Sequence, residues 1–543
     1  MVSGRLTLSW VGRDQALLHT ADGGYEWVPR DDPEATEVRL LREVGKAGDV
    51  TGDASDNLLI QGDSGHALQA LARTPEYRDQ YRGKVRLVYI DPPFNTKQAF
   101  ANYDDSLEHS IWLTMMRDRL LLIKELLAPN GSVWVHLDDA EMSYCRVIMD
   151  EIFGRSNFVT TFIWQKVDSP NDNKVSVTPD HEYIMCYTKT PGAHDDWPQK
   201  PDDSILSAYG AIDENGRRYR DRLLKKNGKN SLRQDRPTMW YELTAPDGTS
   251  VYPIHDDGRE ANWAAGKKKV EELIAKGLLV WKRRPDPVGG EKWVPYTREW
   301  APETPSRPWP TIWTDVKTSR QAKRHLSELF PGETPFDTPK PEQLLERVIS
   351  IGSEPGDIVL DCFGGSGTTA AVAHKTGRRW VTVERNRHTV DSFIYPRLER
   401  VVRGGDPGGV TESTGWEQGG GFRHLAIASS IYERSGGRIF LADWVAGEDF
   451  VAAVAAQLGF IHEEVSSSPY CGRRGRTRLA VVEGVVDEVV ARSLLGQLDD
   501  GERAVIVGIG VTPEAETLLR QLSPGSRALK APRDLVNRGK VIR

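Results

Sequence analysis

The chain of 543 residues lacks several features that would place it in a familiar class. It has only four cysteines, and no two of them form the C-x-x-C pair typical of zinc sites, so we expect free buried thiols in a reducing compartment. No apolar run approaches the roughly 20 residues of a membrane span, and the N-terminus has no signal-peptide profile. These absences predict a cytoplasmic protein without a membrane partner.

The chain also has no excess of positive charge. The formal net charge is −7 and the mean hydropathy is −0.49, so any nucleic acid must bind through a local basic patch. No G-K-[ST] segment is present, which argues against a phosphate-clamping ATPase loop. The length exceeds what one core accommodates and predicts two to four domains.

Two separate stretches of the chain show strands alternating with helices. In the first, apolar runs at 85–90 and 132–137 predict strands, and 111–127 predicts a helix that stops at 129–131. In the second, a helix at 341–351 precedes a strand ending at Asp361, a helix at 369–375 and a strand at 380–383. This rhythm predicts one α/β fold with a mostly parallel sheet.

The rhythm breaks between these stretches, where the chain is rich in Pro, Gly, Trp, Lys and Arg. We therefore predict five segments. They are a β appendage at 1–50, the first half of the α/β domain at 51–190, an inserted domain at 191–335, the second half at 336–405, and a C-terminal region with a weaker α/β pattern at 406–543.

The first strand runs directly into Asp91-Pro92-Pro93-Phe94. Two prolines fix an extended path and remove two backbone donors, so their carbonyls face outward as acceptors. A carboxylate next to a carbonyl can accept both hydrogens of an exocyclic amine, and the Phe94 ring offers a face for a nucleic-acid base. A rigid structural turn is the alternative interpretation.

The second strand ends in the glycine-rich segment Phe363-Gly364-Gly365-Ser366-Gly367. Glycines let the backbone approach a ligand closely, and the helix that follows directs free N–H groups toward it. The next strand ends at Glu384, where an acid binds ribose hydroxyls in nucleoside sites. Alone, this pattern fits a generic nucleotide loop or a plain turn equally well.

Together the two loops resemble those of β-class DNA adenine-N6 methyltransferases, and more closely the modification subunits of type III restriction–modification systems. In that class the amine-binding loop precedes the cofactor loop and a recognition domain lies between them. One departure is Phe94, where tyrosine is more usual. Further matching segments are 59–63, 89–96, 112–120, 152–154, 157–158, 181–183, 338–342 and 420–423.

The resemblance implies a Rossmann-like sheet in circularly permuted order, with a target-recognition domain at 191–335 and an interaction domain at 406–543. It implies that S-adenosylmethionine binds the glycine-rich loop, and that no metal is needed. Asp91, Pro92, Pro93 and Phe94 would act on a flipped adenine. The implied cofactor residues are Asp63, Thr338, Lys340, Asp361, Phe363, Gly364, Gly365, Ser366, Gly367, Thr368 and Glu384, with Thr338 and Lys340 near the methionine end and Glu384 on the ribose.

Some alternatives stay open at this stage. Asp63 either lines the cofactor pocket or only caps a helix. The enzyme could act on cytosine N4, or the chain could be a catalytically silent recognition subunit. The implied partners are double-stranded DNA, a second copy of the chain, and a separate helicase–nuclease or other phage-defence subunit.

Overall fold

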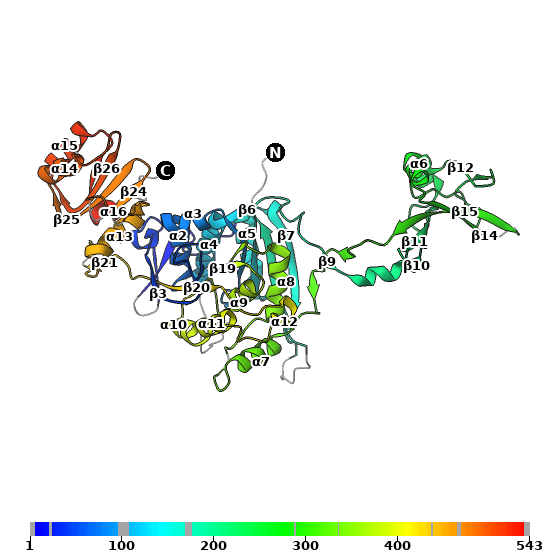
Figure 1. Cartoon of the computed structure of the whole chain (residues 1–543), viewed down its shortest axis with the longest axis horizontal. Coiled ribbons are helices and arrows are strands. Elements are labelled where there is room, and N and C mark those ends of the chain that lie inside the picture. The colour runs from blue at the N-terminus through cyan, green and yellow to red at the C-terminus, as the bar shows by residue number, and fades with distance from the viewer. Residues whose placement is uncertain are drawn as a thin grey trace. The chain divides into compact units, whose positions relative to one another are not determined.

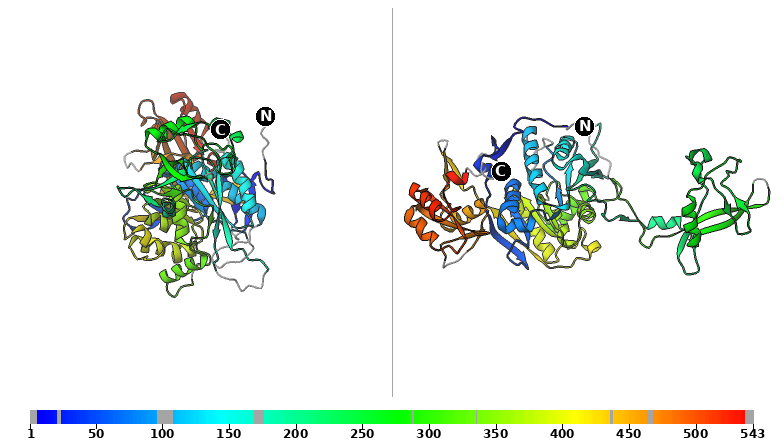
Figure 2. Two further views of the ribbon diagram at one scale, coloured as in Figure 1. Left: turned by 90° about the vertical axis from the view of Figure 1, so that its right-hand side faces the viewer. Right: turned by 90° about the horizontal axis from the view of Figure 1, so that it is seen from above.

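The computed structural model describes residues 6–20, 24–95, 108–168, 176–286, 289–334, 336–435, 438–463 and 468–536. The chain divides into two compact units, of which the first is Met1–Pro198 with Pro310–Arg543. The second unit, Gln199–Trp309, is inserted into the first and is drawn in teal and green in Figures 1 and 2. Among the described residues, no helix combines the length and the apolar character needed to cross a membrane.

A ten-stranded mixed sheet forms the centre of the first unit. The strands from β6 to β20 are parallel, whereas β8 pairs antiparallel with β6 and β7, and β3 pairs antiparallel with β20. In spatial order the strands are β17 (Ile312–Trp313), β7 (Phe158–Gln165), β8 (His181–Thr188), β6 (Leu127–Leu137), β5 (Val85–Ile90), β18 (Ile358–Asp361), β19 (Arg379–Glu384), β4 (Asn57–Gln61), β20 (Gly421–Ile427) and β3 (Leu41–Gly48).

Helices cover both faces of this sheet, as Figure 1 shows. Val88 and Ile90 of β5 belong to the core cluster that contains residues of α2, α4 and α5. The alternate residue Leu87 faces α8, because a Cβ on Gly352 would lie 2.7 Å from Leu87 Cδ1. The helices are α2 (Ser64–Arg73), α3 (Pro75–Tyr81), α4 (His109–Leu126) and α5 (Met142–Phe153) on one side, and α8 (Glu342–Gly352), α9 (Thr368–Lys375) and α11 (Tyr395–Val402) on the other.

The strand order brings the two predicted loops together. β5 and β18 are far apart in sequence, yet they are parallel neighbours with Leu87 opposite Val359 and Val88 opposite Leu360. Their carboxyl ends therefore meet at one edge of the sheet, where ligands bind in open α/β folds. The predicted α/β class, with its permuted Rossmann-like sheet, is confirmed.

Several segments differ from the predicted boundaries. The segment 1–50 contributes a hairpin of β1 (Gln15–His19) and β2 (Tyr25–Pro29), the short α1 (Pro33–Thr36), and also β3, an edge strand of the central sheet. Residues 310–335 stay with the first unit, because Ile312 and Trp313 pair with β7. β6 begins at Leu127 rather than at 132, and its pairing with β5 shifts register between Val85 and Leu87.

The inserted unit is mainly antiparallel. Its four-stranded sheet has the order β10 (Ala211–Ile212), β11 (Arg218–Leu223), β15 (Glu291–Trp300) and β14 (Leu279–Pro285). Its small core contains the buried Trp263, and also Val270 from α6. The remaining elements are β9 (Lys200–Pro201), β12 (Leu243–Thr244), β13 (Ser250–Val251), α6 (Lys267–Ala275) and β16 (Ser306–Arg307).

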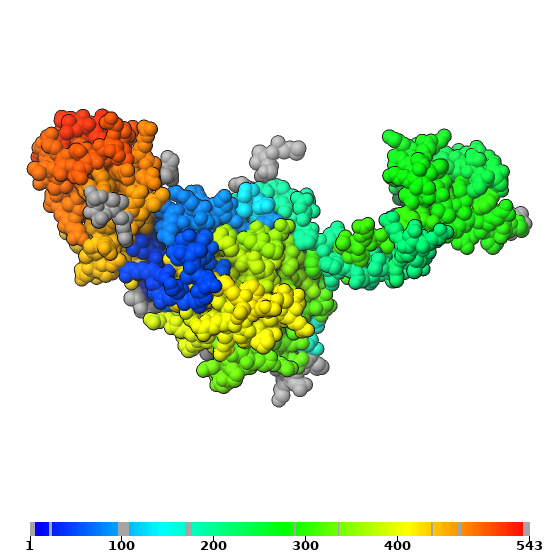
Figure 3. Space-filling view, viewed as in Figure 1, coloured from blue at the N-terminus to red at the C-terminus, as the bar shows by residue number. Residues whose placement is uncertain are grey.

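The C-terminal region has a second sheet, β23 (Ile461–His462), β24 (Gly472–Arg474), β25 (Thr477–Val486), β26 (Arg503–Val511) and β27 (Arg527–Lys530). Its helices are α13 (Gly447–Leu458), α14 (Glu488–Leu495), α15 (Pro513–Leu522) and α16 (Arg533–Val536). Arg434 pairs with Asp32, and Arg42 pairs with Asp449. These ion pairs join the N-terminal segment, blue in Figure 3, to this region.

Candidate active site

The loop of Asp91, Pro92, Pro93 and Phe94, called the target loop below, starts where β5 ends. Asp91 Oδ2 lies 2.8 Å from Lys340 Nζ, and the Asp91 side chain is 22% exposed. Asp91 Oδ1 is buried and has no hydrogen-bond partner among the described residues. A buried acceptor without a partner is costly, so this oxygen is poised to accept a hydrogen from a ligand.

Of the two proline carbonyls in this loop, one has a hydrogen-bond partner among the described residues and the other has none. Pro93 O accepts a hydrogen bond from Trp112 Nε1 at 2.7 Å, and Trp112 is fully buried. Trp112 thus supports the loop from beneath. Pro92 O accepts no hydrogen bond from any residue that the structure describes. Asp91 Oδ1 and Pro92 O are therefore two adjacent acceptors that remain available.

Lys340 connects the loop to a buried acid. Its Nζ lies 4.9 Å from the centre of the Phe94 ring and 3.7 Å from Glu182 Oε2, in addition to its contact with Asp91. Lys340 was predicted to lie near the methionine end of the cofactor. In the structure it also contacts the target loop directly. The ion pair with this ammonium group fixes the position of the Asp91 carboxylate.

Glu182, in β8, is the centre of a small charged cluster. Its carboxylate lies 2.8 Å from His136 Nε2 and 3.1 Å from Lys166 Nζ. Burial would raise the pKa of Glu182, but Lys340, His136 and Lys166 together hold it below its usual value. His136 Nδ1 lies 2.7 Å from the Tyr89 hydroxyl, and burial raises the pKa of that hydroxyl.

The glycine-rich segment 363–367, called the cofactor loop below, is held mainly through its backbone. Asp361 Oδ1 accepts a hydrogen bond from Phe363 N at 3.0 Å, and Asp361 Oδ2 accepts one from Thr369 Oγ1 at 2.6 Å. Burial outweighs these two bonds and raises the pKa of Asp361 to about 8. Gly367 caps α9 with φ of 75°, a left-handed conformation that favours glycine.

Glu384 closes the other side of this loop. Its Oε2 accepts a hydrogen bond from Gly365 N at 3.0 Å, and its Oε1 accepts one from Asn386 N at 2.8 Å. Burial raises the pKa of Glu384 above its usual value. The carboxylate therefore orders the glycine-rich segment while it also lines the cavity.

A buried ionic cluster supports the loop from behind. Arg397 donates to Ser366 O at 3.2 Å, to Thr368 Oγ1 at 2.9 Å and to Glu342 Oε1 at 2.8 Å. Lys375 Nζ lies 2.8 Å from Glu342 Oε2 and 2.6 Å from Asp406 Oδ2. Glu342, Asp406 and His325 have the spacing of metal ligands, but the Lys375 ammonium already supplies the cation between the two acids.

Both loops open into one cavity of about 730 Å³. Almost every predicted site residue lines it, and the exception is Gly367, which lies at the start of α9. The predicted residues that line it are Asp63, Asp91, Pro92, Pro93, Phe94, Thr338, Lys340, Asp361, Phe363, Gly364, Gly365, Ser366, Thr368 and Glu384.

The structure adds residues that the sequence did not assign to the site. Lys166, Glu182, Arg119, His19 and Tyr25 also line this cavity. Glu182 lies in the matching segment 181–183, which was the one available signal for it. The hairpin residues carried none, because only the folded chain brings β1 and β2 to the cofactor loop.

Asp63 caps α2 and also lines the cavity. Its Oδ1 accepts a hydrogen bond from Gly65 N at 2.8 Å at the start of α2, and its Oδ2 lies 2.7 Å from Arg119. Burial alone would raise the pKa of Asp63, but Arg119, His19 and His66 hold it well below its usual value. The ionised carboxylate lines the cavity as well.

Curated DNA methyltransferases are similar to this chain in sequence. The chain is 38% identical to the type II methyltransferase M1.MboII of Moraxella bovis over 331 residues, which cover 60% of this chain and 94% of that one. It is 29% identical to the type III EcoPI Mod subunit of Escherichia phage P1, covering 59% and 55% respectively. The chain spans about half the length of the type III modification subunits that it matches.

Solved structures are also similar. The cytosine-N4-specific PvuII DNA methyltransferase matches 68% of this chain and 94% of its own, at 15% identity and a TM-score of 0.30. A family model described as DNA methylase, for N6 and N4 methyltransferases, matches residues 85–395, more than half of the chain and both loops. The chain belongs to this DNA methylase family.

Proposed function

We propose that the protein transfers a methyl group from S-adenosylmethionine to N6 of an adenine in double-stranded DNA. The single observation that carries this proposal is the pair of available acceptors, Asp91 Oδ1 and Pro92 O, in the same cavity as the glycine-rich loop. An exocyclic amine has two hydrogens, which match two acceptors. A base in a duplex cannot reach such a cavity, so the target must flip out.

The residues around the cofactor loop fit S-adenosylmethionine. Gly364 and Gly365 leave space for a close approach, and the Glu384 carboxylate beside them can accept hydrogen bonds from ribose hydroxyls. When bound, this cofactor supplies a methyl group on a positively charged sulfur. The chain's task is to place the target nitrogen in line with that methyl group.

The target loop would do so through hydrogen bonds. Asp91 Oδ1 and Pro92 O accept the two N6 hydrogens, which directs the nitrogen lone pair away from the purine ring. Lys340 fixes Asp91 in position through their ion pair, and Phe94 stacks on the base. In the methyl transfer that the bound cofactor would supply, the new N–C bond would replace the C–S bond, whose electron pair would stay on sulfur, and Asp91 would accept the proton that N6 loses.

The test is to identify the methylated base. DNA incubated with the protein and S-adenosylmethionine is digested to nucleosides and analysed by mass spectrometry. We expect N6-methyladenine with the wild type and none with Asp91→Ala. N4-methylcytosine would replace adenine with cytosine as the target, and no methylated base with folded protein would favour the silent recognition subunit.

The inserted unit Gln199–Trp309 is our proposed DNA-reading element. It has 21 lysines and arginines against 17 aspartates and glutamates, a net charge of +4 in a chain of −7. Such a local excess suits contacts with phosphates, and the affinity should then fall steeply with added salt. Exchanging this unit with that of a relative should transfer the sequence preference, whereas retention of the original site would assign recognition to another region.

The names of the relatives support a wider assembly. Several of them are modification subunits of type III restriction–modification enzymes. We propose that this chain likewise modifies DNA for a restriction or phage-defence system, as a homodimer with a separate restriction subunit. Sedimentation of the purified protein tests the dimer, and co-purification of the native complex tests the second subunit.

A further inference from the structure

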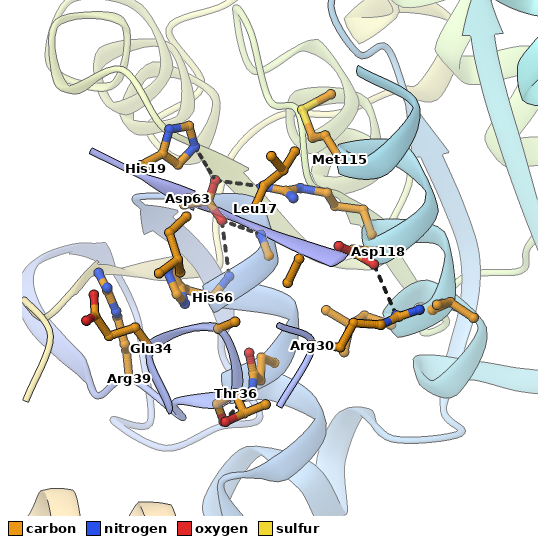
Figure 4. A pocket seen from close by; sticks show the side chains of 18 of the residues that line it. Leu17, His19, Arg30, Glu34, Thr36, Arg39, Asp63, His66, Met115 and Asp118 are labelled. Atoms are coloured by element: carbon orange, nitrogen blue, oxygen red, sulfur yellow. Dashed lines mark hydrogen bonds and ion pairs between the residues drawn. The ribbon is translucent and has the colours of Figure 1, made fainter. Parts of the chain in front are cut away.

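A second cavity, of about 490 Å³, lies next to the candidate active site (Figure 4). Residues of the β1–β2 hairpin, α1, α2 and α4 form its walls, among them Leu17, Thr36, His66 and Asp118. This volume is within the range of small-molecule sites. The proposed methyl transfer gives most of these residues no role.

The carboxylates in its wall are already neutralised. Four acids line the cavity, and each has an arginine partner. The pairs are Asp63 with Arg119 at 2.7 Å, Asp118 with Arg117 at 2.8 Å, Glu125 with Arg82 at 2.8 Å, and Glu34 with Arg434. Three of these partners (Arg82, Arg117 and Arg434) are not lining residues. Asp118 also pairs with the lining Arg30 at 3.3 Å.

Three of the five lining arginines have acid partners, because Arg119 pairs with Asp63, Arg30 with Asp118 and Arg39 with Glu37. Arg30, Arg39, Arg73, Arg119 and Arg385 all line the cavity. Arg73, in the last turn of α2, and Arg385, just after β19, make no side-chain ion pair or hydrogen bond with any described residue. Their positive charge remains available to a ligand of the opposite sign.

His66 adds an unused hydrogen-bonding atom. Its Nδ1 is buried and has no hydrogen-bond partner among the described residues. Burial and the neighbouring Arg39 lower the pKa of His66 to about 4, so the imidazole is neutral at pH 7. A neutral imidazole carries one N–H, which can donate to an anionic oxygen without adding charge.

We propose that this cavity is a second ligand site for a phosphate-bearing anion, of which a nucleotide is the largest member that its volume suits. Arginines with free guanidinium groups recognise phosphate through paired hydrogen bonds. The Tyr25 and His19 rings, whose centres lie 4.4 Å apart, provide an aromatic wall for a nucleoside.

The position of the site suggests how it could influence the active site. His19, Tyr25, Asp63, Met115, Arg119 and Arg385 line both cavities. Asp63 and Arg119 form an ion pair in the shared wall. An anion near Arg119 would compete with Asp63 for it and so change the affinity of the cofactor, an effect that rests on the proposed function and must be reciprocal.

The test measures binding directly, without methylation. Inorganic phosphate, pyrophosphate, uridine monophosphate and uridine triphosphate are titrated into the full-length protein by calorimetry. Uridine is chosen because its base differs from the adenine of S-adenosylmethionine. Each titration is repeated with saturating S-adenosylhomocysteine, which should fill the cofactor cavity and leave the second site available.

The variant is Arg73→Ala, and its matched control is Arg78→Ala. Both arginines are surface residues of neighbouring helices, but Arg78 pairs with Asp79 and does not line the cavity. We expect at least one probe to bind in the millimolar range or tighter, and Arg73→Ala to weaken it about tenfold, or about 1.4 kcal/mol. Arg78→Ala should leave the affinity unchanged.

The probes separate the possible ligands. Tighter binding of the uridine nucleotides than of pyrophosphate supports a nucleotide, and the reverse supports an inorganic anion in the same site. Three outcomes would overturn the proposal: no probe binds, S-adenosylhomocysteine displaces the probe completely, or the two arginine variants behave alike. These results do not depend on whether the protein methylates DNA.

Discussion

The two loops that line the active-site cavity are held in different ways. The cofactor loop is bound on several sides, by Asp361 to Phe363 N, by Glu384 to Gly365 N and by Arg397 to Ser366 O. The target loop is held by the Lys340 ion pair and by Trp112, and its Asp91 Oδ1 and Pro92 O have no hydrogen-bond partner among the residues that the structure describes.

This difference follows from what each loop would bind. Backbone groups fixed by buried side chains give a preformed surface, which suits a cofactor that binds in the same way at every turnover. Acceptors without partners suit a group that arrives only with the flipped base. The two halves of the site should therefore fail separately when single residues are changed.

The largest expected effect comes from the target loop. Asp91→Ala removes the acceptor for the amine and for its proton, so the methylation rate should fall by at least about a thousandfold, as when a key transition-state contact is lost. Because the cofactor rests on the other loop, its dissociation constant should change little. Calorimetry with S-adenosylmethionine and a single-turnover methylation assay measure the two effects.

Asp91→Asn is the matched variant, since it keeps the shape and removes the charge beside Lys340. It should be nearly as inactive as the alanine variant. A rate close to wild type in either variant would contradict the role given to Asp91, and a loss of cofactor binding would show that the two halves do not fail separately.

The opposite half is tested at Glu384. Hydrogen bonds to a charged group contribute about 1.5–3 kcal/mol, so Glu384→Ala should weaken S-adenosylmethionine binding at least about tenfold. Glu384→Gln keeps an acceptor for Gly365 N and should fall between the alanine variant and wild type. DNA affinity, measured by fluorescence anisotropy, should stay unchanged. A defect limited to DNA binding would contradict this assignment.

A smaller effect is expected at Glu182, which acts on the target loop through Lys340. Glu182→Gln removes one of the two carboxylates that share this ammonium, so Lys340 should move toward Asp91 and displace its carboxylate from the target amine. We expect kcat to fall about tenfold, with an unchanged cofactor dissociation constant. An equal loss of cofactor binding and rate would point to misfolding instead.

Much of the fold was visible in the sequence, because buried parallel strands leave apolar runs and their functional loops leave Asp-Pro-Pro-Phe and glycine-rich segments. The boundaries were less accessible. Trp313 looked like part of the insert, yet it is fully buried beside β7, a pairing between residues far apart in the chain. The contribution of β3 to the central sheet was hidden for the same reason.

The site shows the same limit. Residues that act through local geometry, such as Asp91 and Gly365, were predicted from short motifs. The contact between Lys340 and Asp91 joins residues almost 250 positions apart. Glu182 of β8 likewise contacts His136 of β6 and Lys166, which follows β7. Charge pairing of this kind depends on the folded sheet, so no single segment of sequence announces it.

The smallest effect concerns the pH dependence of stability at Asp361, below the cofactor loop. Its pKa is about 8 in the folded protein, against 3.8 for an unperturbed carboxyl. Between these values the folded state retains a proton that the unfolded state has lost. The stability contributed by this group is therefore greatest below about pH 4, and it falls as the pH rises toward 8, by at most about 1.4 kcal/mol per pH unit.

Asp361→Asn tests this sign. The amide is neutral at every pH, can still accept from Phe363 N, and can donate to Thr369 Oγ1, so the variant should fold. Chemical denaturation of both proteins between pH 5 and 8 gives the difference in their unfolding free energies. We expect the unfolding free energy of the variant to increase relative to that of the wild type as the pH rises. Only the wild type releases a proton from this position when it unfolds, and a higher pH favours that release. If the two curves of unfolding free energy against pH were parallel, Asp361 would be ionised in the folded protein across this range. The carboxylate that binds the cofactor loop would then be charged.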